Sequence, residues 1–317
     1  MTGGFARGVR RSGVLPVCLM LVVMIALNAW LQPRFFGYAS LESNIATFAP
    51  SILVCAAQAI VVLNRQLDLS VGAGISLINC ALAVLPPDLP GGSWTAAGAA
   101  MALAVAMGLV NGTLVAVLGL PPLIATFATG AVWFGLALAL LPQPGGSVHP
   151  DLGEVYAAEW LGVPAPLLIV AAAMAAWTLL ARHRVGRWIV AVGSNPAAAF
   201  QAGIRVRWTT LGAFVAAWVL VALSALSISA QTLSGDARLG QTYTLTSVAA
   251  VVLGGISLSG GRGSPWGAVL GALVLGIIAN VIYFAGMPSI WQEFFKGLVI
   301  MAALGLMVLG QTPRRVT

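Results

Sequence analysis

Apolar segments of about twenty residues recur along this 317-residue chain and constrain its fold more than any other feature. A helix of that length crosses the hydrocarbon core of a bilayer and satisfies its own backbone N–H and C=O groups there. Hydrophobic residues make up 60% of the sequence and charged residues only 7%, whereas soluble domains carry about 25% charge. A soluble globular fold is therefore excluded, and we predict an all-α, multi-pass membrane protein.

The chain holds about ten such segments at this spacing and leaves no room for a second domain, so residues 1–317 are expected to form one transmembrane domain. Pro121 and Pro122 separate the fourth helix from the fifth, because proline removes a backbone donor and clashes with the preceding turn. No small-residue cleavage site follows the first apolar segment, which we therefore expect to be a retained span. The expected helices cover residues 14–32, 44–63, 69–86, 93–118, 121–141, 164–181, 208–231, 243–259, 265–285 and 290–310.

Glycines concentrate between the eighth and ninth expected helices. Non-helical backbone at membrane depth is tolerated where it lies against protein, and glycine adopts left-handed conformations without steric cost. We therefore expect a broken or re-entrant eighth helix and a glycine-rich gate segment, formed by Gly254, Gly255, Gly260, Gly261 and Gly263. A weak similarity between residues 61–72 and 251–261 suggests an internal repeat, although such short strings also recur by chance.

The basic residues predict the orientation, because cytoplasmic segments carry an excess of Lys and Arg. With the N-terminus inside, Arg34 and Arg238 alone fall outside, and Lys296 lies within the last helix. We expect both termini, the tail 1–13 and the loop 182–207 in the cytoplasm, and the loop 142–163 in the periplasm. The cytoplasmic segments then hold twelve of the 15 basic residues: Arg7, Arg10, Arg11, Arg65, Arg182, Arg184, Arg187, Arg205, Arg207, Arg262, Arg314 and Arg315.

The acidic residues have the opposite distribution. An acidic outer face is suited to basic patches on a periplasmic partner, and the alternative is a set of solvated loop ends. Asp68 and Glu293 are the two exceptions. The outside loops hold the other six of the eight acidic residues: Glu42, Asp88, Asp151, Glu154, Glu159 and Asp236.

A polar stretch, residues 64–72, interrupts the apolar pattern between the second and third helices and reads N-R-Q-L-D-L-S-V-G. A charged side chain at the centre of a membrane helix costs roughly 2.5–3.5 kcal/mol. Arg65 and Asp68 must therefore reach an interface, line a wet cavity or contact another protein, and Ser70 is a possible cap for the third helix. An ordinary cytoplasmic turn is the alternative.

The loop 182–207 is the only sizeable cytoplasmic segment, and it carries the signals of a short helix. Ser194 or Asn195 can cap a helix that has Pro196 at its first position, and Gly203 can end it. A short capped helix of this kind is what a membrane protein presents to a soluble partner.

The sequence offers no catalytic constellation. His149 and His183 fall on opposite sides of the membrane and cannot share a metal, and the net charge of +7 reflects arginines at helix ends rather than a nucleic-acid partner. Residues 258–262, L-S-G-G-R, look like the L-S-G-G-Q signature of ABC ATPases. Nucleotide binding also needs a Walker A lysine, and Lys296 is the only lysine. The cysteines lie in apolar segments without metal-ligand spacing and are expected to be small buried hydrophobes: Cys18, Cys55 and Cys80.

Four stretches share one resemblance. Residues 67–72 are close to I-D-L-S-V-G, residues 108–126 fit G-x-x-N-G…P-P-F-I-x-T, and residues 186–204 fit G-R-x-x-x-A-x-G-G-N-x-x-A-A…S-G-I. Residues 249–267, with V-L-G-G and S-G-G-R-G-S, match best. The chain thus resembles the permease subunit of carbohydrate-importing ABC transporters, the ribose/xylose/arabinose/galactose group that includes autoinducer-2 importers. One departure is N-R-Q-L in place of the family's T-x-G-G-I, which fits a heterodimer at least as well as a homodimer.

The resemblance implies a channel in the bacterial inner membrane, formed by this chain and a second copy or a paralogue. Two ATPase subunits with ATP and Mg dock inside, and a periplasmic binding protein delivers a sugar or sugar-like solute outside. This chain itself is then no enzyme and binds no cofactor. The residues implied to couple the chain to the ATPase are Arg187, Gly193, Ser194, Asn195, Pro196, Ala197, Ala198 and Gly203.

Polar side chains within the apolar helices are candidates for the translocation path. The alternative for each is an interhelical hydrogen bond, worth roughly 0.6 kcal/mol. A rival class, a secondary transporter or channel, needs an intramembrane ionisable site, and Glu293 with Lys296 on one helix face is the candidate for it. The path candidates are Gln58, Asp68, Ser70, Asn79, Asn111, Thr126 and Asn280.

Overall fold

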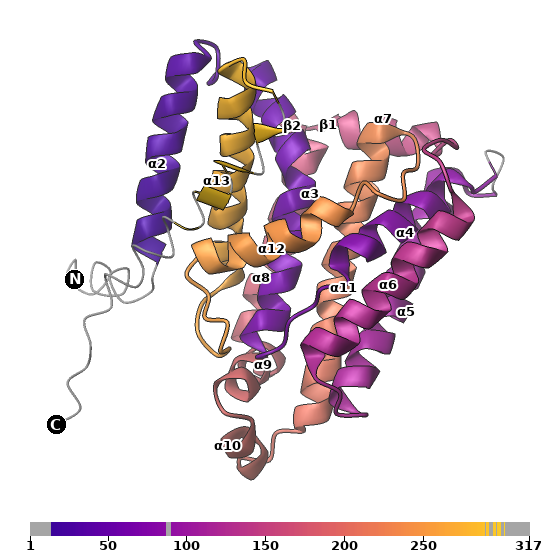
Figure 1. The fold of residues 1–317 in the computed structure, drawn as a ribbon, viewed down its shortest axis with the longest axis vertical. Coiled ribbons are helices and arrows are strands. Elements are labelled where there is room, and N and C mark those ends of the chain that lie inside the picture. The colour runs from indigo at the N-terminus through magenta and orange to yellow at the C-terminus, as the bar shows by residue number, and fades with distance from the viewer. Residues whose placement is uncertain are drawn as a thin grey trace.

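A computed structural model describes residues 14–86 and 90–288, together with 290, 291, 294, 295, 297, 298 and 301. These residues form helices joined by short loops and a single antiparallel pair of two-residue strands (Figure 1), which confirms the all-α prediction. The elements are α2 (Val14–Leu31), α3 (Tyr38–Leu63), α4 (Val71–Ala83), α5 (Gly92–Ala116), α6 (Pro122–Leu140), α7 (Pro150–Ala157), β1 (Glu159–Trp160), β2 (Val163–Pro164), α8 (Ala165–Arg182), α9 (Arg184–Ser194), α10 (Pro196–Gln201), α11 (Val206–Thr232), α12 (Gln241–Leu253) and α13 (Pro265–Phe284).

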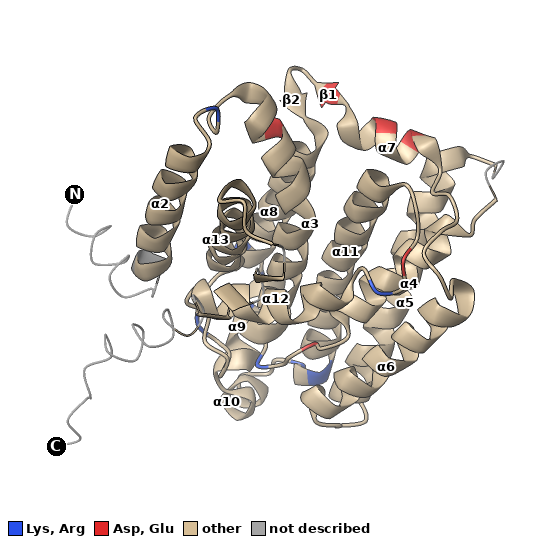
Figure 2. Cartoon of the chain, turned by 45° about the horizontal axis from the view of Figure 1, so that its top comes forward, with Lys and Arg blue, Asp and Glu red and all other residues tan. Residues whose placement is uncertain are grey.

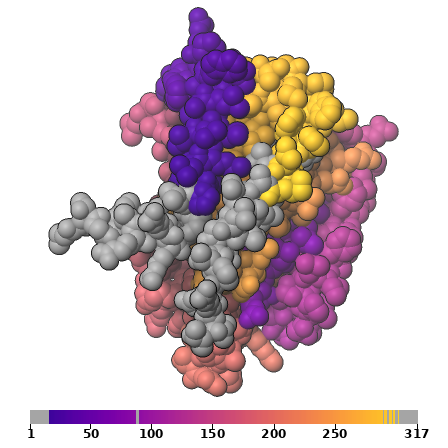
Figure 3. Space-filling view, turned by 60° about the vertical axis from the view of Figure 1, so that its left-hand side comes forward, coloured from indigo at the N-terminus to yellow at the C-terminus, as the bar shows by residue number. Residues whose placement is uncertain are grey.

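Six of these helices are long and apolar enough to cross a membrane: α3, α5, α6, α8, α11 and α13. Helix α2 is a seventh apolar helix, and Figure 3 shows it on the surface beside α13, with outward side chains such as Val22 and Trp30 exposed. The expected helix 290–310 lies mostly outside the described residues. The count of ten spans therefore stays a prediction.

Two of the expected spans are wrong in length. The third and eighth helices, expected at 69–86 and 243–259, are the 13-residue α4 and α12. At about 1.5 Å per residue each is about 20 Å long, which is shorter than the hydrocarbon core of about 30 Å. Helix α12 stops at Leu253, where Gly254 and Gly255 begin a loop that continues to Ser264. Both helices are half-spans, and the loop that follows α12 is glycine-rich.

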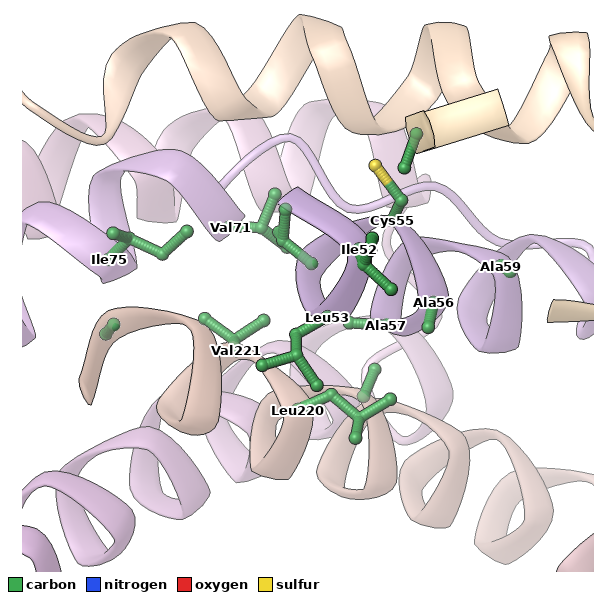
Figure 4. Close-up of a cluster of buried hydrophobic side chains, with 14 of the residues drawn as sticks. Ile52, Leu53, Cys55, Ala56, Ala57, Ala59, Val71, Ile75, Leu220 and Val221 are labelled. Atoms are coloured by element: carbon green, nitrogen blue, oxygen red, sulfur yellow. The ribbon is translucent and has the colours of Figure 1, made fainter. Parts of the chain in front are cut away.

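The core lies where α3, α4 and α11 meet. Figure 4 shows Ile52 and Leu53 of α3 directed toward α4 and α11, among fully or nearly fully buried neighbours. Cys55 and Cys80 are buried, as expected of small hydrophobes, whereas Cys18 is partly exposed on α2. All three are free thiols. Apolar side chains on the outer faces of α2, α5, α6 and α8 are exposed, which suits contact with lipid or a second chain.

A proline inside α3 is compensated by a helix far away in the sequence. Pro50 has no N–H, so the carbonyl of Ala46, one turn earlier, loses its helical partner. The Tyr156 hydroxyl in α7 donates to this carbonyl oxygen at 2.7 Å. The Tyr156 side chain is only 6% exposed, whereas Ala46 is half-buried and borders, with Tyr156, a cavity of about 420 Å³.

We expect Tyr156→Phe to lower the free energy of unfolding by about 0.5–1.5 kcal/mol, because it removes the hydroxyl that replaces the missing helical partner of the Ala46 carbonyl. In a Pro50→Ala background, which restores the helical N–H, the same change should cost much less. Thermal unfolding of detergent-purified protein measures both. Tyr38→Phe is the control, since its hydroxyl bonds Glu159 at an exposed site. Equal effects in the two backgrounds would contradict this account.

The units α3–α4 and α11–α12 form an inverted repeat. Helix α3 runs from the α7 end of the bundle to the α10 end, and α11 runs the opposite way (Figure 1). Corresponding residues lie 168 positions apart: Arg65 and Leu233, both at left-handed turns after the long helix, have φ of 64° and 50°. Three residues later, Asp68 and Asp236 each accept a bond at 2.8 Å from the backbone N–H two residues on.

The two half-spans meet at their first turns. The N–H of Gly72 donates to Thr244 Oγ1 at 3.1 Å, and the N–H of Gly240 donates to Ser76 Oγ at 2.9 Å. These reciprocal bonds follow the same 168-residue offset, so α4 and α12 start together inside the protein and run to opposite ends. The repeat expected between 61–72 and 251–261 is therefore wrong in register, although the turns that end α3 and α12 do share one geometry.

Candidate functional site

The polar stretch after α3 ends in a buried cluster centred on Asp68. Asp68 Oδ1 accepts from the Ser70 N–H at 2.8 Å and from Ser70 Oγ at 2.6 Å. Asp68 Oδ2 accepts from Trp218 Nε1 at 2.9 Å and from Asn111 Nδ2 at 3.2 Å. Thr129 Oγ1 extends the network by donating to Asn111 Oδ1 at 2.7 Å. We call these five residues the Asp68 cluster.

The Asp68 cluster ties the start of α4 to α5, α6 and α11. Asp68, Ser70 and Asn111 have no exposed surface, and the carboxylate lies at the N-terminus of α4, where the helix dipole favours negative charge. Ser70 does occupy the N-cap position, as predicted, but its side chain makes no capping bond and donates to Asp68 instead. Arg65, by contrast, is exposed and lies outside the cluster.

Three of the other path candidates are also enclosed within this chain. Thr126 accepts from the Leu69 N–H at 3.0 Å, and Asn79 Oδ1 accepts from the Asp236 N–H at 2.8 Å. Gln58 is fully buried on α3, and neither of its amide atoms has a partner among the described residues. The roles of these residues in translocation stay predictions, and their observed contacts are structural.

Asn280 is the path candidate that borders open space. Its Nδ2 donates to Asn44 Oδ1 at 2.7 Å, and it lines a cavity of about 190 Å³ between α3, α12 and α13. We call this space the hydroxyl-lined cavity, because most of its polar lining consists of hydroxyl side chains: Thr47, Ser51, Thr242, Tyr243 and Thr246.

Sequence reasoning missed those hydroxyl residues, although a signal was present. Thr47 and Ser51 are four residues apart on α3, and Thr242 and Thr246 are four apart on α12. That spacing places each pair on one helix face. Hydroxyl side chains are common in apolar helices, where each usually bonds to the backbone of its own helix. Only the structure shows that the hydroxyl-bearing faces of α3 and α12 lie against the same cavity.

The short helix expected in the loop 182–207 is confirmed. The Asn195 side chain caps it by accepting from the Ala198 N–H at 3.0 Å, Pro196 is its first residue and Gly203 turns the chain with φ of 81°. This helix, α10, projects from the end of the bundle (Figure 1). Ala198 and Phe200 are exposed, and Phe200 keeps 73% of its surface.

Helix α9, which the sequence reading missed, fixes α10 to the bundle. Its buried residues are Gly186, Ile189, Val192 and Gly193, which form one apolar helix face. A Cβ at Gly193 would overlap the carbonyl oxygen of Leu63, the last residue of α3. Asn64 Nδ2 also donates to the Ile189 carbonyl at 3.2 Å. Helix α9 therefore connects α10 to the end of α3 and to the turn that leads to Asp68.

The glycine-rich loop joins the same junction. The Gly261 N–H donates to the Leu63 carbonyl at 3.0 Å, and Ser194 Oγ donates to the Gly261 carbonyl at 3.3 Å. Gly255, Gly260 and Gly261 have φ of 73°, 80° and 70°, which favour glycine, as does the φ of 119° at Gly263. Gly254 has a negative φ, and glycine is needed there because a Cβ would overlap the backbone of Gly267. The role of the glycine-rich loop as a gate stays a prediction.

The two ends of the bundle carry opposite charge (Figure 2). Among the described residues, Arg34 and Arg238 are the basic residues in the connections at the α7 end. His149 and His183 begin α7 and α9, at opposite ends as expected. Glu293 and Lys296 lie outside the described residues. The α7 end holds Glu42, Asp151, Glu154, Glu159 and Asp236, and the α10 end holds Arg65, Arg182, Arg184, Arg187, Arg205, Arg207 and Arg262.

The chain has clear relatives of known kind. It matches the family described as branched-chain amino acid transport system / permease component over residues 40–304. It is 32% identical to the ribose import permease protein RbsC of Escherichia coli strain K12, over 90% of this chain and 91% of that protein. It is 34% identical to the autoinducer 2 import system permease protein LsrC of Klebsiella pneumoniae subsp. pneumoniae, over 93% and 85%. No solved structure matches. With a match that spans nearly the whole helical bundle, the chain belongs to this family of transport-system permeases and is a multi-pass protein of the bacterial inner membrane.

Proposed function

We propose that the chain is the membrane subunit of an ABC importer for a sugar or sugar-like solute, with the α10 end in the cytoplasm. The observation that carries the proposal is α10 itself, a capped and exposed helix that directly follows α9, which in turn is bonded to the end of α3. The relatives are named for ribose and autoinducer-2 import, and such import by an ABC system uses separate ATPase subunits and a binding protein.

The charge distribution supports this orientation. Seven of the nine basic residues that the structure describes lie at the α10 end, and the positive-inside rule assigns that end to the cytoplasm. We propose that both termini lie inside as well, as the ten-helix topology expects. The acidic α7 end faces the periplasm, where the binding protein docks.

The hydroxyl-lined cavity supports a neutral, hydroxylated solute. Its lining offers hydroxyl and amide groups and the Tyr243 ring but no charged side chain, whereas a zwitterionic amino acid needs partners for two charges. We propose that this face of α3, α12 and α13 lines the translocation path. A second copy of the chain or a paralogue completes the channel, since the cavity opens to the surface of this one.

Coupling follows from the contacts at the α10 end. ATP and Mg bind the partner ATPase and not this chain. Closure of the ATPase pair moves α10, and α9 transmits the motion to Leu63 and the glycine-rich loop. The binding protein and the nucleotide then favour different conformations of the same translocation path. Binding at one site therefore changes the affinity at the other.

We expect Ala198→Arg to leave membrane insertion intact and to remove the ATPase or uncouple ATP hydrolysis from uptake. Ala198 is exposed on α10, so the substitution costs little folding energy but places a bulky charge on the docking surface. Copurification of the ATPase, with uptake in proteoliposomes, measures the effect. Ala157→Arg, at the exposed end of α7, is the matched control for insertion and ATPase copurification, because it makes the same change at the opposite end of the bundle. Retention of both the ATPase and normal uptake in Ala198→Arg would overturn the proposal.

A further inference from the structure

A polar pocket with two arginines lies beside α10 and has no role in the account so far. It has a volume of about 400 Å³ and lies between the turn after α3, the end of α9 and the glycine-rich loop. We call it the arginine pocket, and it is lined by two arginines, three serines and a glycine: Arg65, Ser194, Ser257, Ser259, Gly260 and Arg262.

The backbone holds Arg65 in this pocket at an energetic cost. The Arg65 N–H donates to the Val62 carbonyl at 2.9 Å, and the Gln66 N–H donates to Val61 at 3.1 Å. This pair of bonds closes the C-terminus of α3 around one residue in the left-handed conformation, a position that glycine usually occupies. Arg65 has a φ of 64° there, which costs a residue with a side chain roughly 1–2 kcal/mol.

The end of α12 shows the same turn with the usual residue. The Gly255 N–H donates to Val252 at 3.0 Å, the Ile256 N–H donates to Val251 at 3.1 Å, and Gly255 has a φ of 73°. The turn therefore forms without an arginine. The conformation itself therefore gives no reason for an arginine at position 65, and the reason is to be found in what the side chain contacts.

The charge in the pocket is unbalanced within the described part of the chain. Neither Arg65 nor Arg262 forms an ion pair there. Five of the six described acidic residues lie at the α7 end, and the sixth, Asp68, is enclosed in its own cluster. A guanidinium group binds a carboxylate through two parallel hydrogen bonds. A pocket lined by two such groups and by serine hydroxyls is therefore suited to an acidic group.

We infer that the arginine pocket receives an acidic side chain of the ATPase subunit that docks on α10. Ser194 lines the pocket and directly precedes Asn195, the cap of α10, so a protein seated on α10 also covers the pocket. This inference rests on the proposed function and adds a second contact to it. The contact attaches the ATPase directly to the turn after α3 and to the glycine-rich loop, and not only to α10.

Charge reversal tests the inference. With the chain in nanodiscs of phosphatidylcholine, Arg65→Glu and Arg262→Glu are each expected to weaken binding of the purified ATPase by about tenfold or more. Arg207→Glu is the matched control, because it makes the same charge change at an exposed residue of α11 outside the pocket. Arg65→Gly separates docking from folding: it suits the left-handed turn, so thermal stability should hold or rise while ATPase affinity falls.

Each outcome has a distinct reading. Wild-type ATPase affinity in Arg65→Glu and Arg262→Glu, with loss in Ala198→Arg, overturns the arginine pocket and leaves the proposed function standing. Wild-type affinity in all three variants overturns both. An effect that appears only with phosphatidylglycerol in the bilayer, on activity rather than ATPase affinity, means that the pocket binds a lipid phosphate and also overturns the inference.

Discussion

Replacement of Asp68 by asparagine is expected to lower the free energy of unfolding by about 2–4 kcal/mol and to impair transport far more than membrane insertion. Four bonds converge on the two carboxylate oxygens. An amide has only one accepting oxygen, so its NH₂ group must face either the Ser70 N–H or Trp218 Nε1–H. Neither donor can reverse its role, and a buried donor without an acceptor costs roughly 1–3 kcal/mol in addition to the lost bonds.

The repeat supplies the control for Asp68. Asp236 accepts from the Arg238 N–H through one oxygen only and is partly exposed. An asparagine oxygen can accept the same bond, so Asp236→Asn should stay within about 0.5 kcal/mol of wild type. Membrane yield, thermal unfolding in detergent and solute uptake at equal protein levels compare the two variants. Wild-type stability and uptake in Asp68→Asn would reduce the cluster to an ordinary turn.

The crossing of α4 and α12 should be at least as sensitive. An added Cβ at Gly240 would overlap the carbonyl oxygen of Gly72, and one at Gly72 would overlap that of Gly240. Neither glycine has a positive φ, so the requirement is the close approach of two backbones and not a special conformation. This overlap can be removed only if the two half-spans move apart, and that movement breaks both reciprocal bonds. We expect Gly72→Ala and Gly240→Ala each to cost about 3–5 kcal/mol, at the upper end of single-residue effects.

Gly98→Ala is the matched control for this crossing. Gly98 lies inside α5 with no atom near the position of an added Cβ, so alanine should stabilise the helix by about 0.4–1 kcal/mol. Thermal unfolding and protease resistance of the purified proteins measure all three variants. If the two crossing variants unfold at the same temperature as wild type, the contact between the half-spans is not part of the stable fold.

Local signals in the sequence were sufficient for several features. The apolar segments predicted most of the helices, because twenty apolar residues have few alternatives in lipid. Asn195, Pro196 and Gly203 predicted α10, since a cap, a first-turn proline and a left-handed end each act within a few residues. Asp68 and Asn111 were also selected as functional candidates from polarity alone, and the structure brings them together.

The features that the sequence did not predict depend on contacts between distant residues. The lengths of α4 and α12 are set where their first turns meet, and that meeting pairs Gly72 with Gly240 across the repeat. Hydropathy cannot distinguish a half-span that is buried in protein from a full span in lipid. The true repeat register was also hidden, because only isolated identities mark it, Asp68 with Asp236 and Gly72 with Gly240. Between them the turn geometry is kept without the residue type, since Arg65 and Leu233 share a conformation but no chemistry.

The reciprocal bonds between the half-spans also set an order of events during synthesis. Gly72 emerges from the ribosome 172 residues before its partner Thr244, and Ser76 emerges 164 residues before its partner Gly240. Asp68 precedes Trp218 by 150 residues. At elongation rates of about 5–20 residues per second, these polar groups wait roughly 8–30 s for their bonds. Throughout that interval α4 is too short to cross the bilayer, and at its start only α5 and α6 can supply partners, through Asn111 and Thr126. The nascent N-terminal half must therefore be sheltered from lipid, by the insertion machinery or by water, until α11 and α12 arrive.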